Sequence, residues 1–138
     1  MFTMLLKIIR YIWALPNTLL GIVIGIFTLL TGGKMTLIRG AIEFHGGLGK
    51  FLLKHCTLLK GGAAAITIGH VIHGQDENCL HRVRDHEHVH VRQYERWGPF
   101  FIPAYLLASF YLYCKGRDGY FENPFEVEAY AKEKDGIE

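Results

Sequence analysis

The strongest chemical signal in the sequence is a group of histidines. Four of the eight histidines fall within one ten-residue block, and the segment His86-Glu87-His88-Val89-His90 contains the pattern H-E-x-x-H. On a helix, His86 and His90 project from one face at a spacing that lets both rings bind one zinc ion. Glu87 lies about 100° further around the helix, where its carboxylate can take a proton from a water at the metal. The pattern therefore predicts metal-assisted hydrolysis.

The other side chains of this helix predict which of its faces is buried. At ~100° per residue, the two pattern histidines share an arc with apolar and aromatic residues, so this arc is expected to face the interior. Its members are Val83, His86, His90, Gln93, Tyr94 and Trp97. The opposite arc is polar and predicts solvent exposure, His88 included. It holds Arg84, Asp85, His88, Arg92, Glu95 and Arg96. Two buried histidines need polar partners, and a metal ion supplies them. The alternative is a solvated, histidine-rich helix face.

A catalytic zinc site needs a third protein ligand and one open position. Near the end of the chain, Glu126 and Glu128 are candidates, but they cannot both face one ion because they are two residues apart on a helix. His70 and His73 are weaker candidates that lie upstream of the histidine pattern. From spacing alone, the third ligand stays open among these residues.

Three helices are predicted to position these side chains. The histidine pattern lies on a helix over residues 79–97, which stops at Gly98-Pro99. A very apolar helix over 102–114 is only about a dozen residues long, which favours a core helix over a membrane span. A last helix over 124–134 carries the two glutamates, and an Asn-Pro pair opens it.

Strand patterns precede these helices. Residues 34–47 predict two short strands joined by a tight hairpin at Arg39-Gly40. Residues 64–72 are rich in β-branched side chains and bounded by glycines, which predicts one strand. Residues 51–59 fit either a strand or a short helix. The expected fold class is α+β, with a hydrophobic N-terminal helix, a small, mainly antiparallel sheet and then the helical part.

The N-terminal segment predicts membrane attachment. The stretch at 13–30 is apolar and free of charge, and as a helix it would span roughly 27 Å, close to the thickness of the hydrocarbon core. Pro16 and Asn17 are expected to break it, leaving a separate helix before them. We therefore divide the chain into a membrane anchor at 1–33 and a compact domain at 34–138. The alternative is an apolar helix that packs on the domain or mediates oligomerisation.

Charge and cysteine content narrow the function classes. The formal net charge is +2 and no long basic run is present, which gives no indication of nucleic-acid binding. Three widely spaced cysteines without a CxxC motif disfavour a disulfide framework and fit a reducing compartment. More lysines and arginines follow the apolar stretch than precede it, which favours a cytoplasmic domain.

Two segments together resemble a known family. HEHVHVRQYERWGPFFIPAY followed by NPFEVEAYA is similar to small bacterial membrane-associated proteins of the gluzincin type. These are metallopeptidase-like domains with H-E-x-x-H on one helix and a glutamate ligand on a later one. The resemblance extends to LPNTLLG and GGAAAITIGHVIHG, and so covers nearly the whole chain. It implies a zincin-like helical part and a place in the bacterial inner membrane.

The resemblance also assigns roles to residues. His86 and His90 match the histidine ligands of a zinc ion, and Glu87 matches the catalytic base. In related membrane peptidases the third ligand begins an E-x-x-A-D pattern. The letters EVEA at Glu126 match its start, which selects Glu126 over Glu128 as the ligand.

The sequence departs from that pattern at its last position, where Tyr130 stands in place of the aspartate. This aspartate normally orients a metal ligand, so its absence leaves open how the histidines are held. Tyr130, Tyr105 or Tyr120 could instead donate a hydrogen bond to a substrate oxyanion. The alternative for each tyrosine is packing in the core.

Peptidases of this kind also present an edge strand beside the metal helix, and an extended peptide adds to it by main-chain hydrogen bonds. The resemblance implies this role for Ala65, Ile66, Thr67 and Ile68. The leading hypothesis is thus a membrane-anchored zinc metallopeptidase that acts on a peptide or protein substrate. One alternative is a non-catalytic zinc-binding scaffold or interaction protein that retains this fold. Another is a structural membrane protein with a coincidental histidine cluster.

Overall fold

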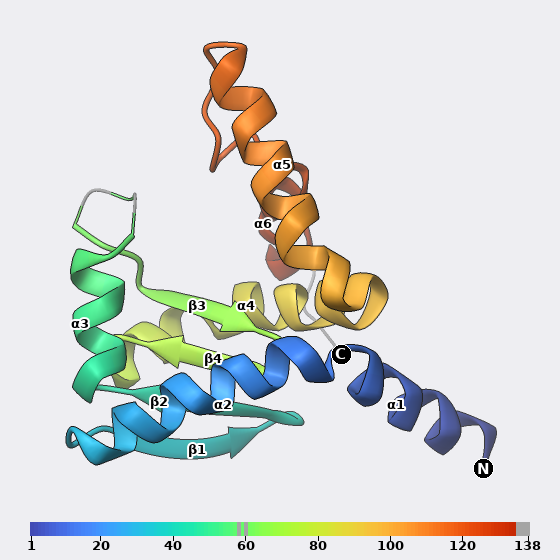
Figure 1. Cartoon of the computed structure of the whole chain (residues 1–138), viewed down its shortest axis with the longest axis vertical. Helices are drawn as coiled ribbons and strands as arrows, with labels where there is room; N and C mark the ends of the chain where they lie inside the picture. Colours follow the sequence, from blue (N-terminus) through green and yellow to red (C-terminus); the bar gives the residue numbers. More distant parts are fainter. Residues whose placement is uncertain (58, 60, 135–138) are drawn as a thin grey trace.

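The computed structural model describes residues 1–57, 59 and 61–134, and within these residues one four-stranded sheet forms, with β1 at the lower edge of the molecule in Figure 1. The strands occur in the order β1-β2-β4-β3. They are β1 (Lys34–Ile38), β2 (Ala41–His45), β3 (Ala65–Ile68) and β4 (Val71–Gly74). β1 pairs with β2 and β3 with β4 in antiparallel fashion, but β2 and β4 are parallel. The sheet expected to be mainly antiparallel is therefore mixed.

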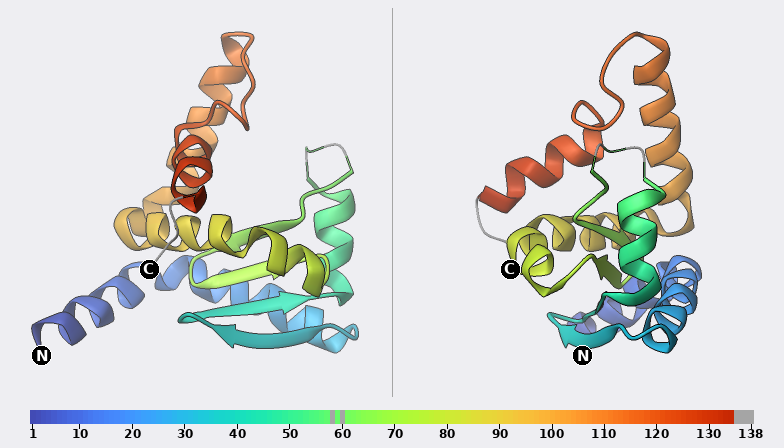
Figure 2. Two further views of the ribbon diagram at one scale, coloured as in Figure 1. Left: turned by 180° about the vertical axis from the view of Figure 1, so that it is seen from behind. Right: turned by 90° about the vertical axis from the view of Figure 1, so that its left-hand side faces the viewer.

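Helices cover both faces of this sheet and extend beyond it. They are α1 (Phe2–Trp13), α2 (Leu15–Leu30), α3 (Gly47–His55), α4 (Glu77–Trp97), α5 (Phe101–Cys114) and α6 (Pro124–Lys134), with a short 3-10 turn, η1 (Gly98–Phe100), between α4 and α5. α2 covers one face of the sheet and α4 lies against the other (Figures 1 and 2). α5 leads away from the sheet, and α6 returns beside it to pack on α4. The α+β class is confirmed.

Two tight hairpins build the sheet. Arg39 and Gly40 both have positive φ, 53° and 80°, as a type I′ turn requires, which confirms the predicted hairpin. The single strand predicted at 64–72 is wrong, because the chain reverses at Gly69 and His70. Gly69 has a φ of 66°, which only glycine adopts readily. His70 donates its backbone N–H to the Thr18 hydroxyl on α2, at 3.0 Å, and so ties this turn to the helix above it.

The segment left open between strand and helix, 51–59, is helical over its first part, since α3 ends at His55. Residue 58 lies outside the described residues. The predicted helices at 79–97, 102–114 and 124–134 all form. α4 begins two residues earlier than expected, because the Asp76 side chain caps it by accepting the Cys79 N–H at 2.7 Å.

The apolar N-terminal stretch forms two helices, as expected, but the break lies at Ala14 rather than at Pro16-Asn17. Pro16 sits in the first turn of α2, where its missing N–H leaves no helical hydrogen bond unmade. Among the described residues, no single helix has the length and hydropathy to cross a membrane. α1 and α2 meet that requirement only together, across a bend of 63°.

α2 packs on the sheet through a face of small and polar residues. A Cβ atom on Gly21 would lie 2.7 Å from the Cβ of Val71, and one on Gly25 would overlap the ring of Phe44. The helix backbone therefore approaches the strands as closely as glycine permits. The buried residues of α2 are Asn17, Thr18, Gly21, Gly25 and Thr28.

α5 was predicted to be a core helix, and this prediction is wrong. Only Phe101 and Leu112 of its residues are buried. The helix stands clear of the sheet and packs along one side only, next to the segment that leads into α6 (Figure 1). Its sequence is apolar all round, which is the reason that hydrophobicity alone does not separate it from a core helix.

Polar side chains join α4 to the sheet. Arg84 donates two hydrogen bonds of 2.8 Å to the buried carboxylate of Glu43 on β2, and His88 lies 3.9 Å from the same group. His88 is only 5% exposed, so the prediction that it lies in solvent is wrong. Trp97 was placed on the buried arc, but it is 43% exposed and packs its ring edge to face with Phe125 of α6. In the arc opposite the pattern histidines, Arg84 and His88 therefore face β2, while Arg92 and Arg96 are exposed as expected.

Among the described residues, His73 on β4 is a buried histidine without a charged partner. Its Nε2–H donates to the carbonyl of Gly21 at 3.1 Å, its ring stacks on Phe44, and no described group forms a hydrogen bond with its Nδ1. Burial lowers the pKa of His73 to about 4, although the Gly21 hydrogen bond acts in the opposite direction. The folded chain therefore keeps this ring neutral at pH values where an exposed histidine is protonated.

This difference predicts acid destabilisation. Between about pH 6.5 and pH 4 the unfolded chain takes up a proton at His73 that the folded chain refuses. The free energy of unfolding should therefore fall as the pH is lowered through this window, by up to about 3 kcal/mol. Denaturant unfolding in mild detergent measures it, with His73→Phe as the comparison. The variant should show a flatter pH dependence, and equal slopes for the two proteins would contradict the assignment.

Candidate metal centre

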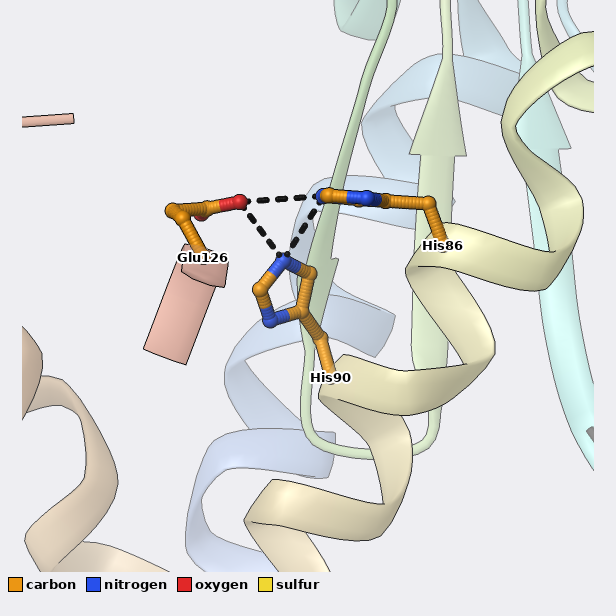
Figure 3. A group of neighbouring side chains, drawn as sticks. All are labelled: His86, His90 and Glu126. Carbon is orange, nitrogen blue, oxygen red and sulfur yellow. Dashed lines mark hydrogen bonds and ion pairs between the residues drawn. The ribbon is translucent and has the colours of Figure 1, made fainter. Parts of the chain in front are cut away.

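Three side chains meet between α4 and α6. His86 and His90 project from consecutive turns of α4 toward Glu126 in the first turn of α6 (Figure 3). The Oε1 atom of Glu126 lies 2.9 Å from His86 Nε2 and 3.2 Å from His90 Nε2, and the two Nε2 atoms are 3.3 Å apart. All three residues are buried, at 4–6% exposure. Because each offers one ligand atom within 4.8 Å of the others, the group could hold a metal ion.

Gln93 determines which nitrogen of His90 faces this group. The Gln93 Nε2 donates to the Phe125 carbonyl at 2.9 Å and to Glu128 Oε1 at 2.7 Å, so its Oε1 atom must accept the hydrogen bond from His90 Nδ1, at 2.8 Å. A neutral His90 with its proton on Nδ1 has a lone pair on Nε2. That is the tautomer a metal ligand needs.

Glu126 gives the cluster its negative charge. Burial acts to raise the pKa of this carboxyl, but the hydrogen bonds with His86 and His90 outweigh it and lower the pKa to about 2. Tyr105 on α5 donates its hydroxyl proton to Glu126 Oε2 at 2.6 Å. Burial and the nearby Glu126 charge raise the pKa of Tyr105, so this hydroxyl keeps its proton and remains a donor.

The two histidines lie in a field that favours positive charge. Burial alone would lower the pKa of His90, but the Glu126 hydrogen bond and the charge of Glu87 raise it to about 9. The pKa of His86 is raised by the same two groups against the same opposing effect of burial. An ion with a positive charge would therefore be stabilised at this position.

Glu87 lies on the side of α4 that faces β3. Its Oε2 atom accepts a hydrogen bond of 2.7 Å from the hydroxyl of Thr67, which holds the carboxylate in place. Glu87 is 6% exposed, and its charge raises the pKa values of both His86 and His90. Glu87, the predicted general base, thus lies close enough to His86 and His90 for its charge to act on both rings.

Two side chains from α6, those of Tyr130 and Glu133, lie next to the His86 ring. Tyr130, which occupies the position of the expected aspartate, packs its ring 4.3 Å from that of His86 and pairs its hydroxyl with that of Tyr120, at 3.1 Å. Glu133, one turn further on, places a carboxylate oxygen 3.5 Å from the buried His86 Nδ1. The only carboxylate near this nitrogen is therefore Glu133, within the described residues.

Glu133 was not among the candidate ligands predicted from the sequence. Its spacing of seven from Glu126 puts the two residues on one face of a helix, and this is the signal that could have pointed to it. Gln93 was placed on the buried arc without a role. Its contact with His90 is local, between residues three apart on α4, but its hydrogen bonds to Phe125 and Glu128 of α6 orient its amide.

The structure separates the remaining candidates from this group. Glu128 points away from the histidines, toward Gln93, Arg96 and Lys132. The Nε2 atom of His70 forms a hydrogen bond of 2.9 Å with a carboxylate oxygen of Glu95, and its ring stacks on Tyr11. His73 faces α2, as described above. Among the candidates for a third ligand, only Glu126 lies with the two histidines.

β3 is an edge strand of the sheet and lies against α4. Ala64 O accepts the Gln75 N–H across the hairpin, so the N–H and C=O of Ala65 and Thr67 point to the free edge. The Thr67 carbonyl already accepts the Tyr94 hydroxyl at 3.0 Å. The binding of a substrate to this free edge of β3 stays a prediction. Of the two residues whose main chain points to that edge, Thr67 already accepts the Tyr94 hydroxyl and Ala65 does not.

Comparison of the chain with protein-family models, with curated proteins and with solved structures finds no match. The resemblance to gluzincin-type proteins therefore remains a prediction from the motifs. The proposed function below is therefore argued from the geometry of His86, His90, Glu126 and Glu87.

The role of Gln93 can be tested with a probe ion. Gln93→Leu removes the acceptor that holds the His90 tautomer, so we expect the dissociation constant for Zn²⁺ to rise about 10–100-fold. Competition against a chromophoric chelator measures it. Arg92→Leu is the matched control, since Arg92 is the exposed neighbour on the same helix. Equal affinities for the two variants would show that Gln93 does not act on the metal group.

Proposed function

We propose that the protein is a membrane-attached zinc metallopeptidase in which His86, His90 and Glu126 hold the ion and Glu87 is the general base. The observation that carries the proposal is the meeting of three buried ligand atoms, from two histidines and Glu126, with a second carboxylate, that of Glu87, beside them. Buried lone pairs that face one another need a cation between them or protons shared among them. The donor set of two imidazoles and one carboxylate is one that zinc enzymes use.

The spacing of the ligand atoms also suits zinc. Ligands at 2.0–2.1 Å in a tetrahedral arrangement lie roughly 3.3 Å from one another. The separations in this group are 2.9, 3.2 and 3.3 Å, so binding an ion needs only a small outward movement, mainly between Glu126 and His86. The fourth tetrahedral position would remain for water or substrate.

The residues around the group have separate roles in this proposal. Bound zinc supplies a Lewis acid that polarises a peptide carbonyl and makes water more acidic. Glu87 accepts the proton of the attacking water and returns it to the leaving amine. Thr67 orients the Glu87 carboxylate by its hydrogen bond. Tyr105 and Gln93 hold Glu126 and His90 in position.

Membrane attachment belongs to the same proposal. The outward side of α2 is formed by bulky apolar side chains, while its inward side is small and polar. Soluble proteins rarely expose so large a contiguous apolar surface without a partner. Its exposed residues are Leu15, Leu19, Leu20, Val23, Ile26, Phe27, Leu29 and Leu30. The resemblance to the gluzincin-type family implies that this membrane is the bacterial inner membrane, and the lysines and arginines after the apolar stretch favour the cytoplasmic side for the sheet.

A second candidate is a zinc-binding scaffold without catalysis. Burial favours it, because ligands at 4–6% exposure leave little access for a peptide. Zinc would then be structural, and His90→Ala would unfold the chain rather than only inactivate it. A parent protein that binds zinc and hydrolyses no peptide would favour this candidate.

Glu87→Gln tests the peptidase proposal. The amide cannot accept the proton of water, but it can still accept the Thr67 hydrogen bond, so the variant should bind zinc as the parent does. We expect its hydrolysis of a fluorogenic peptide library in detergent micelles to fall about 10²–10⁴-fold.

The matched control for this change is Asp85→Asn, which neutralises a half-exposed carboxylate two residues before Glu87 that pairs with Arg39 instead. It should leave both zinc binding and hydrolysis unchanged. A Glu87→Gln variant as active as the parent would remove Glu87 from the chemistry and with it the peptidase proposal.

A further inference from the structure

α5 exposes apolar side chains on its outer side, while its inner side combines hydrogen bonds with the buried apolar residues Phe101 and Leu112. Its inner side makes hydrogen bonds: Tyr105 donates to Glu126, and Ser109 donates to the Gly119 carbonyl while it accepts from Asn123. Its outer side is apolar and exposed, with Leu107 at 68% and Phe110 at 65%. A helix in water buries its apolar side instead. The other exposed members of this outer side are Leu106, Tyr111 and Tyr113.

α2 also has an exposed apolar outer side, and its inner side is small and polar. Its inner side donates and accepts hydrogen bonds through Asn17, Thr18 and Thr28, which bond to Gly98 O, His70 N–H and Gly49 N–H. Close packing through small residues with hydrogen bonds between elements, and bulky apolar residues outside, is the pattern of helices that pack in lipid. α5 shares with α2 the hydrogen bonds on the inner side and the exposed apolar residues on the outer side.

The two apolar sides belong to one side of the molecule. In the right-hand view of Figure 2, α2 and α5 lie on one side, and α4 and α6 on the other. They are linked where the α1–α2 junction meets η1. There Trp13 donates to the Arg96 carbonyl at 3.2 Å and packs 6.0 Å from Phe100, which is 61% exposed. We call the exposed apolar residues of α2 and α5, with Phe100 between them, the apolar surface.

We propose that the apolar surface as a whole lies in one bilayer, so that α5 is a second membrane contact beside α2. This inference rests on the membrane attachment proposed above. The length of α5, 14 residues or about 21 Å, is too short to cross the hydrocarbon core of about 30 Å, so α5 enters one leaflet without spanning.

Charge favours lipid over other occupants of the apolar surface. The first 42 residues contain no acidic residue, and α1 carries Lys7 and Arg10, both exposed. α5 has no charge, and Lys115 follows directly after it, with its ammonium 5.6 Å from the Tyr111 ring. Cationic and aromatic residues at the rim of an apolar surface fit anionic headgroups.

This placement restricts the substrate. Tyr105 reaches Glu126 from the inner side of the same helix whose outer side enters the leaflet. The candidate metal centre therefore lies within one helix diameter, about 10 Å, of the lipid. The substrate class that follows is a peptide segment next to a membrane, such as the end of a membrane-bound protein, rather than a freely diffusing peptide.

Fluorescent labelling of the full chain tests the inference. In a background with Cys56, Cys79 and Cys114 changed to serine, Leu107→Cys on α5 receives an environment-sensitive dye. The matched control is Val127→Cys, which is 52% exposed and belongs to α6, the helix on the other side of the molecule in the right-hand view of Figure 2. Both proteins are mixed with vesicles of phosphatidylcholine and phosphatidylglycerol, with and without a spin-labelled lipid. We expect a blue-shifted emission at position 107 and lipid quenching several-fold stronger than at position 127.

Three results would overturn the inference, and they differ in whether membrane attachment through α2 fails as well. If the chain floats with vesicles but the dye at position 107 is quenched no more than at 127, α5 stays in water while attachment through α2 stands. If the chain does not float, membrane attachment fails as well. If the emission at position 107 is blue-shifted without lipid quenching, and the shift is lost on dilution of the protein, a second copy covers α5.

Discussion

The structure depends on the burial of α4 on two sides. One side of this helix faces the sheet and the other faces α6, yet the helix is rich in ionisable side chains. Each buried charge must find a partner, because an unpaired one costs several kcal/mol. On the sheet side Arg84 pairs with Glu43, and Glu95 pairs with His70. On the other side His86 and His90 meet Glu126, and there the partners are three ligand atoms that a cation would join.

This constraint explains what the sequence could predict and what it could not. The relation between His86 and His90 is local, since it follows from the pitch of one helix, and the predicted spacing holds. Glu126 came from a resemblance in sequence, and the packing of α6 on α4 brings it to the histidines. His88 was placed in solvent because a helical wheel describes one helix and contains no second packing surface.

Other errors have the same origin in contacts between distant segments. The turn at Gly69 is held by Thr18 on α2, and nothing within residues 64–72 indicates that helix. Glu133 approaches His86 only because Tyr130 and the rest of α6 lie along α4. α5 has the composition of a core helix, and what distinguishes it is that its few polar side chains point inward. The polar residues of α2 also point inward, while its bulky apolar residues are exposed. A high content of apolar residues therefore does not show that either helix is buried in the core.

The central claim is that a cation joins His86, His90 and Glu126, and metal analysis of the purified full chain tests it most directly. The protein is prepared in detergent with zinc supplied during expression, and zinc is counted by mass spectrometry for the parent and for His86→Ala. Far-ultraviolet circular dichroism of both samples establishes that they are folded. We expect about one zinc per chain in the parent and almost none in the variant. A folded parent without zinc, or a variant that retains it fully, would show that no zinc ion joins these three side chains.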